Sequence, residues 1–197
     1  MDIKKIRDKA INFGVKRLAE AIGVILIVLS LLLLISLLSY SPEDPNFIFP
    51  ENTEIRNLLG SKGSFTSDFF YQSVGLVSIL IPFSIFFTGL NILKRKVFLI
   101  IIENLFFIIL YLFLGSLFFS AFHTETFWLN INGNNGFIGN FFDDGYLLNF
   151  ISINKNISYY SIIFLILLCF LISINFNLRF FVKNFKFFFN LFFKKKK

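Results

Sequence analysis

The first apolar run of the chain reads AIGVILIVLSLLLLISLLSY, residues 21–40, and it stops at the polar string SPEDP, residues 41–45. No charged residue interrupts the run. A helix needs about 20 apolar residues to cross the roughly 30 Å hydrocarbon core of a bilayer, and it pairs its backbone polar groups internally. A cleaved signal peptide would have a shorter apolar core of about 7–15 residues and a small-residue cleavage site. Residues 21–40 therefore predict an uncleaved membrane span.

Three further stretches, residues 71–93, 97–122 and 157–177, are also long and apolar enough to be spans. Hydrophobic residues make up 56% of the 197 positions and charged residues 16%, with a mean hydropathy of +0.74. Soluble domains contain about 25% charged residues. This composition excludes a compact soluble domain, and the sequence predicts an all-α polytopic membrane protein with four transmembrane helices.

The basic residues are distributed unevenly between the segments that flank the predicted spans. Sixteen of the 19 Lys and Arg residues lie in segments 1–20, 94–96 and 179–197, and the two other loops, 41–68 and 123–155, hold three. Because cytoplasmic loops carry the excess of Lys and Arg, both termini are predicted to be cytoplasmic. The positive charge then reflects topology, and we expect no direct binding of nucleic acid. The predicted layout is a cytoplasmic amphipathic segment over 1–20, a membrane domain over 21–178 with periplasmic loops at 41–68 and 123–155, and a basic cytoplasmic tail over 179–197.

Three segments outside the predicted spans are rich in apolar residues. Residues 1–20 alternate apolar side chains with cations, which is typical of an amphipathic helix lying on an anionic inner leaflet. The tail over 179–197 has a similar mixture. The loop over 123–155 is too apolar to be fully solvated, so we expect an amphipathic or shallow re-entrant segment on the outer leaflet.

The adjacent carboxylates Glu43 and Asp44 are the first candidates for chemistry. Two neighbouring carboxylates can act as a general acid and base, or supply half of a metal site. No His, Cys or third clustered acid accompanies them. Pro42 and Pro45 on either side end a helix, because proline lacks an N–H and restrains the residue before it. We therefore interpret the string as a helix stop on the outer face.

The motifs that could bind a cofactor fail on spacing. The stretch GNNGFIG, residues 133–139, is spaced G-x-x-G-x-x-G, whereas a dinucleotide site has G-x-G-x-x-G between a strand and a helix. No G-x-x-x-x-G-K-[ST] phosphate loop is present. With one His, His123, and one Cys, Cys169, the chain can form no internal disulfide and no cysteine metal cluster. We expect no cofactor, no metal and no catalytic residue.

Few polar residues interrupt the predicted spans. Glu103 is the one acid, about two helical turns beyond the cations at 94–96, and we expect it to snorkel or pair with one of them rather than to relay protons. Its neighbour Asn104 can hydrogen-bond to another helix. Pro82 predicts a kink in the second span. Small residues that allow close helix approach are Gly23, Ser30, Ser36, Gly75, Ser78, Ser84, Gly89, Gly115 and Ser116.

The residues that follow the first span resemble a known family. The string Ser39-Tyr40-Ser41-Pro42-Glu43-Asp44-Pro45 resembles the exit of the first helix in the N-terminal four-span domain of FtsK/SpoIIIE-type DNA translocases. Residues 57–68 are similar to the family's pattern N-x-x-G-x-x-G-A-x-x-A-D, with Ser64 and Ser67 in place of the alanines. The resemblance covers residues 15–178. The motif residues it assigns to structural or interaction roles are Ser41, Pro42, Glu43, Asp44, Pro45, Gly60, Gly63, Asp68, Gly75 and Pro82.

The resemblance implies a membrane anchor and scaffold at the bacterial division septum, linked to chromosome segregation. In the family, this domain holds a cytoplasmic hexameric DNA motor and contacts other division proteins. The motor lies downstream of the resembling region, so we expect this chain to be no enzyme itself. The implied partners are the lipid bilayer, further copies of the chain and other division proteins. The alternatives from the residues alone are a transporter or channel subunit, and an unrelated small inner-membrane protein.

Overall fold

The computed structural model describes residues 3–45, 54–123, 129, 133–142 and 145–176. All regular structure within these ranges is helical, which confirms the predicted fold class. The elements are α1 (Ile3–Leu38), α2 (Gly60–Val74), the 3₁₀ helix η1 (Gly75–Leu80), α3 (Ile81–Arg95), α4 (Leu99–Phe122), α5 (Gly136–Asn140), α6 (Tyr146–Ile153) and α7 (Lys155–Ser173).

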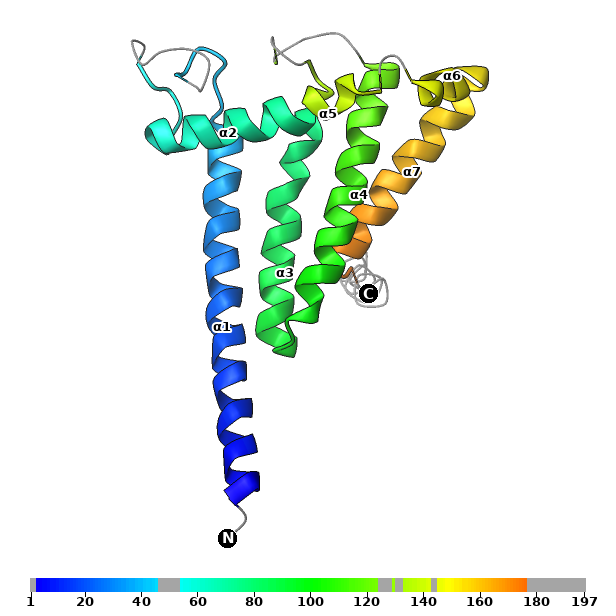
Figure 1. Cartoon of the computed structure of the whole chain (residues 1–197). Coiled ribbons are helices and arrows are strands. Elements are labelled where there is room, and N and C mark those ends of the chain that lie inside the picture. The colour runs from blue at the N-terminus through cyan, green and yellow to red at the C-terminus, as the bar shows by residue number, and fades with distance from the viewer. Residues whose placement is uncertain (1–2, 46–53, 124–128, 130–132, 143–144, 177–197) are drawn as a thin grey trace, which may run out of the picture.

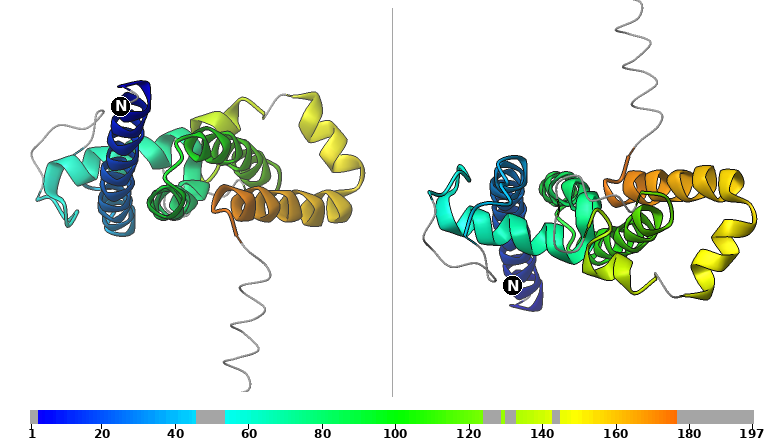
Figure 2. Two further views of the ribbon diagram at one scale, coloured as in Figure 1. Left: turned by 90° about the horizontal axis from the view of Figure 1, so that it is seen from below. Right: turned by 90° about the horizontal axis from the view of Figure 1, so that it is seen from above.

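Four helical segments are long and apolar enough to cross a membrane, as the sequence predicts. They contain α1, α3, α4 and α7, which run lengthwise through the molecule (Figure 1). The short elements α2, α5 and α6 gather at one end, termed the upper end as it is drawn in Figure 1, and the α3–α4 turn marks the lower end. Viewed along the bundle, α3 and α4 lie between α1 and α7 (Figure 2). α1 packs on α3, and α4 packs on α7.

The second apolar stretch is divided into two helices that run in different directions. α2 lies crosswise over the upper end, whereas α3 descends beside α1 (Figure 1). The change of direction occurs at Gly75, whose φ of 73° is favourable only for glycine, and continues through η1. Pro82 lies in the first turn of α3, where a missing N–H leaves no helical bond unmade. The predicted kink at Pro82 is therefore wrong, and the bend belongs to Gly75.

Of the three predicted interfacial segments, two lie at least partly within the described residues, and they differ in form. α1 is one continuous helix, so residues 3–20 prolong the first span along its axis and do not form a separate helix. In the second loop, α6 exposes a run of large apolar side chains, which suits a helix lying in a membrane interface: Tyr146, Leu147, Phe150 and Ile153. The basic tail, 179–197, falls outside the described residues.

Close contact between helices depends on glycine, as the small-residue pattern predicts. A Cβ atom at Gly23 would lie 3.0 Å from the carbonyl oxygen of Gly89, and one at Gly89 would lie 2.7 Å from the carbonyl oxygen of Gly23. α1 and α3 therefore meet backbone to backbone at this level. Gly115 of α4 likewise accommodates Val77 of η1.

Buried polar side chains join α3, α4 and the end of α7. Asn104 donates to the hydroxyl of Thr88 at 2.7 Å, which confirms the predicted interhelical bond, and accepts a bond from Asn175 at 2.7 Å. Ser84 pairs with the hydroxyls of Tyr111 and Ser173, at 3.2 Å and 2.8 Å. These bonds satisfy polar groups that would be costly in a bilayer.

Glu103 does not form the predicted ion pair within the described part of the chain. Its side chain is exposed on α4, and Lys96 instead pairs with Glu20 of α1 at 2.5 Å. Glu20 also binds Arg17 at 2.6 Å. Lys96, the cation nearest in sequence to Glu103, therefore links the α3–α4 turn to α1.

Candidate functional site

The string that ends the first span forms a tight corner with the residues that precede α2. Asp44 is 2% exposed, and its two carboxylate oxygens accept hydrogen bonds from the backbone N–H groups of Arg56 and Asn57, each at 2.8 Å. Charge-assisted bonds of this kind are what a buried carboxylate requires. Asp44 therefore ties the start of α2 to the end of α1.

The neighbouring carboxylate, Glu43, has a different environment. It forms an ion pair with the Arg56 guanidinium at 2.8 Å, and both side chains are more than 60% exposed. Exposed ion pairs contribute only about 0–1 kcal/mol. The two adjacent acids thus divide into a structural residue, Asp44, and a surface residue, Glu43.

Asn57 connects three segments of the corner. Its Nδ2 group donates to the backbone carbonyls of Ser36 at 2.9 Å and Ser39 at 3.3 Å, and its Oδ1 accepts a bond from the N–H of Leu59 at 3.1 Å. The last carbonyls of a helix have no partner within the helix. Asn57 therefore caps α1 and at the same time shapes the turn that leads into α2.

The packing around Gly63 explains why the pattern has a glycine six residues after Asn57. A Cβ atom at Gly63 would lie 2.1 Å from Oδ1 of Asn57, so only glycine leaves room for the capping side chain. The carbonyl of Gly63 accepts a bond from the Ser36 hydroxyl at 2.6 Å, which docks α2 on α1. Ser64, one of the two departures from the family pattern, donates to the carbonyl of Pro45 at 2.7 Å and adds a bond that alanine could not make.

Two tyrosines and Asp68 extend the corner along α2. The hydroxyl of Tyr40 donates to Oδ1 of Asp68 at 3.4 Å, and that of Tyr71 donates to the carbonyl of Leu37 at 3.2 Å. Their rings pack at 4.9 Å between centroids. The two hydroxyl bonds and the packed rings therefore hold α2 against the end of α1.

The glycine-rich stretch at 133–139 packs against the bend after α2. A Cβ atom at Gly75 would lie 2.1 Å from the carbonyl oxygen of Asn134, and one at Gly136 would lie 2.3 Å from the nitrogen of Gly75. The N–H of Leu76 donates to the carbonyl of Asn134 at 3.0 Å. The stretch serves close packing, because Gly136 meets backbone atoms of Val74 and Gly75, and Gly139 meets the Asn135 side chain.

The structure brings only part of the predicted motif together. Asp44, Pro45 and Gly63 meet in the corner, and Asp68 joins it through Tyr40. Gly60 begins α2 with a φ of 66°, Ser41 and Pro42 are half-buried beside Glu43, and Gly75 and Pro82 belong to the bend between α2 and α3. The residues that sequence reasoning did not select are Asn57 and Ser36. Asn57 could have been recognised from its place at the start of the N-x-x-G pattern. Ser36 could not, because the sequence shows it only as one of several small residues in the spans.

The hydrogen bonds of the corner serve packing. Asp44 is engaged by backbone groups, and among the described residues no three His, Cys, Asp or Glu side chains are grouped as a metal site would require. An open groove of about 570 Å³ borders the corner and is lined by Tyr40, Glu43, Arg56 and Leu58, among others. Leu58 is 78% exposed, so an apolar side chain stands beside an exposed ion pair on the upper surface.

Comparison with known proteins identifies the region that this corner belongs to. The family described as the 4TM region of DNA translocase FtsK/SpoIIIE matches residues 15–186. The chain is 41% identical over 69 residues to the DNA translocase FtsK of Rickettsia prowazekii (strain Madrid E), which covers 35% of this chain and 9% of that protein. It is 39% identical over 74 residues to the DNA translocase FtsK of Rickettsia bellii (strain RML369-C), which covers 38% of this chain and 10% of that protein. The matches thus span a small fraction of the relatives' length. No solved structure is significantly similar to the chain.

Proposed function

We propose that this chain, which belongs to the family of the four-transmembrane region of FtsK/SpoIIIE DNA translocases, is a membrane anchor and scaffold of bacterial cell division. Its membrane helices hold the protein in the inner membrane at the septum, in contact with further copies of itself and other division proteins. The DNA-moving motor with which it works is supplied by residues outside 1–197. The chain thereby links the division site to chromosome segregation.

The observation that carries the proposal is the family match over residues 15–186, most of the chain. The structure of the corner gives these motif residues a physical role, because Asp44 and Gly63 fix α2 across the end of α1. That arrangement presents Glu43, Arg56 and Leu58 around one groove. A surface that combines an apolar side chain with paired charges suits a protein partner.

The proposed orientation places both termini in the cytoplasm and the upper end in the periplasm. Its support is the excess of Lys and Arg in the segments at 1–20, 94–96 and 179–197. A topology reporter fused after Arg95 is expected to report the cytoplasm, and one fused after Glu51 the periplasm. The reverse pattern would refute the orientation.

The second candidate is a transporter or channel subunit. It would need polar groups along a path, and Glu103 is the one acid that the sequence offers within the third span. In the structure Glu103 is exposed on α4, whereas the buried polar side chains near it bond to one another. Vesicles containing the chain are therefore expected to show no solute flux, and a flux abolished by Glu103→Gln would favour the transporter.

The function is tested by a chimera. Residues 1–197 replace the membrane region of an FtsK-type translocase in a bacterium that needs this protein to divide, and an unrelated four-span protein at the same position is the control. We expect the chimera, and not the control, to restore division and chromosome partition. Filamentous cells that hold as much membrane-inserted chimera as the wild type holds native protein would contradict the scaffold function.

A further inference from the structure

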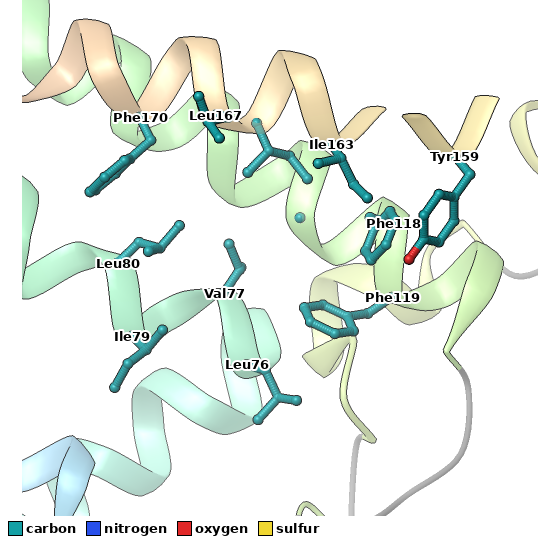
Figure 3. A pocket seen from close by; sticks show the side chains of 12 residues that line it. Leu76, Val77, Ile79, Leu80, Phe118, Phe119, Tyr159, Ile163, Leu167 and Phe170 are labelled. Atoms are coloured by element: carbon teal, nitrogen blue, oxygen red, sulfur yellow. The ribbon is translucent and has the colours of Figure 1, made fainter. Parts of the chain in front are cut away.

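A second groove lies on the side of the bundle where η1, α4 and α7 meet (Figure 3). Its volume is about 480 Å³. Figure 3 shows aliphatic and aromatic side chains from the three elements directed into it, among them Leu80 and Val77 of η1, Phe119 of α4, and Ile163 and Phe170 of α7. The groove is thus an open apolar trough between helices that cross the membrane.

The length of the groove matches one leaflet of a bilayer. Along α7 it runs from Tyr159, about one turn below the upper end of that helix, to Phe170. Eleven residues of α-helix correspond to about 16 Å, and the hydrocarbon core of a bilayer is about 30 Å thick. We therefore expect the trough to extend from the upper membrane surface to about the middle of the bilayer.

Polar groups stand at the upper end of the groove. The Tyr159 hydroxyl forms no hydrogen bond within the described residues, and Figure 3 shows its oxygen at that end, beside Phe118. Lys155 precedes Tyr159 by four residues in α7, so both lie on one face of the helix, and Lys155 is exposed. The ring of His123 lies 5.5 Å from Phe118 and 6.3 Å from Tyr159. The opposite end, at Leu80 and Phe170, is apolar.

We propose that this groove binds a phospholipid of the leaflet at the upper end. One acyl chain lies along the trough, and the phosphate is bound by the Lys155 ammonium with the Tyr159 hydroxyl and the His123 ring beside it. The cation and hydroxyl at the membrane surface complement a phosphate, and the apolar walls complement hydrocarbon. This inference concerns lipid binding alone and does not rest on the proposed role in division.

The groove is too small for a transmembrane helix to enter, although a helix could still pack across its opening. A helix 16 Å long and 10 Å across has a volume of about 1,200 Å³, whereas the groove holds about 480 Å³. A single extended chain is the shape that fits such a narrow trough. The other candidate occupants are side chains of a second copy or the tail over 177–197, and the experiment distinguishes them.

The full chain is reconstituted in nanodiscs of phosphatidylglycerol and phosphatidylcholine that contain a phospholipid with a diazirine in its acyl chain. After illumination, mass spectrometry locates the adducts. We expect them to concentrate on residues 76–80, 115–119 and 159–170. Adducts spread evenly over the exposed faces of α1 and α4 would overturn the proposal, as would a diazirine at Ile163 that cross-links to a second copy or to the tail.

Two matched pairs of variants sharpen the test. Ile163→Trp fills the trough and is expected to reduce groove adducts to the level of the exposed faces, whereas Leu168→Trp, at an exposed position of α7, should leave them unchanged. The double variant Lys155→Gln with Tyr159→Phe is expected to bind phosphatidylglycerol about tenfold more weakly in native mass spectrometry. Lys62→Gln is its control, since Lys62 is an exposed cation of α2 at the same end. Equal losses in the double variant and in Lys62→Gln would overturn the proposed phosphate site.

Discussion

Replacing Asp44 with alanine should destabilise the protein far more than the same change at Glu43. The substitution leaves the N–H groups of Arg56 and Asn57 without the carboxylate oxygens that accept them at 2.8 Å. Hydrogen bonds to charged groups contribute about 1.5–3 kcal/mol each. With the site 2% exposed, we expect a loss of about 3–5 kcal/mol in the free energy of unfolding.

Glu43→Ala is the matched control, because it removes the adjacent carboxylate of the same motif. Its ion pair with Arg56 is mostly exposed to solvent. Such pairs contribute about 0–1 kcal/mol. The difference between the two variants isolates the buried hydrogen bonds from any general effect of removing a negative charge.

Cys169 provides the assay, since it is the single cysteine of the chain and is 4% exposed. A thiol-reactive dye reports its exposure when the purified protein is heated in detergent. A change of 1 kcal/mol shifts the midpoint by roughly 2–4 °C in a chain of this size. We expect Asp44→Ala to lower the midpoint by roughly 6–20 °C, and Glu43→Ala by roughly 4 °C or less.

Hydrogen exchange supplies a local measurement at the corner itself. The amides of Arg56 and Asn57 should exchange faster in Asp44→Ala and at the wild-type rate in Glu43→Ala. Equal midpoints for the two variants, together with unchanged exchange at both amides, would refute the capping role of Asp44.

Three further substitutions and one control test the packing. Gly63→Ala should cost about 1–3 kcal/mol by displacing the Asn57 side chain, which would be seen as a lower midpoint with the same dye. Gly89→Leu should separate α1 from α3 at a similar cost, whereas Gly14→Leu, where nothing lies within 4 Å, should be neutral; equal midpoints would contradict the close approach. Asn104→Leu should lose about 1 kcal/mol, since each interhelical bond in a membrane contributes about 0.6 kcal/mol on average, and a stabilised variant would show that these bonds contribute nothing.

The number and type of the spans could be predicted from composition, because apolar length alone fixes a membrane helix. The division of the second apolar stretch into α2 and α3 could not be predicted in this way. The predicted span 71–93 begins inside α2, and no charged residue occurs between Phe69 and Leu93, so the uncharged run does not reveal that its first residues lie in a crosswise helix. The deciding feature is the positive φ of Gly75, which depends on its contact with Asn134, a residue far along the chain.

The roles of single residues in the corner could not be predicted from the sequence either. Glu43 and Asp44 have the same chemistry and are adjacent, and the sequence gives no reason to separate them. Their roles differ because Asp44 faces backbone N–H groups that lie twelve and thirteen residues further along. The family pattern includes Gly63 as a motif residue, and the physical reason for a glycine at this position is its distance to the Asn57 side chain.

The position of the protein in a dividing cell tests the central claim most directly. A fluorescent fusion of residues 1–197, produced at the level of a native FtsK-type protein, is imaged in a dividing bacterium together with a label for the whole envelope. A septal anchor predicts a band at midcell in cells that are constricting. Fluorescence distributed evenly around the envelope, in step with the membrane label, would contradict a division-site scaffold.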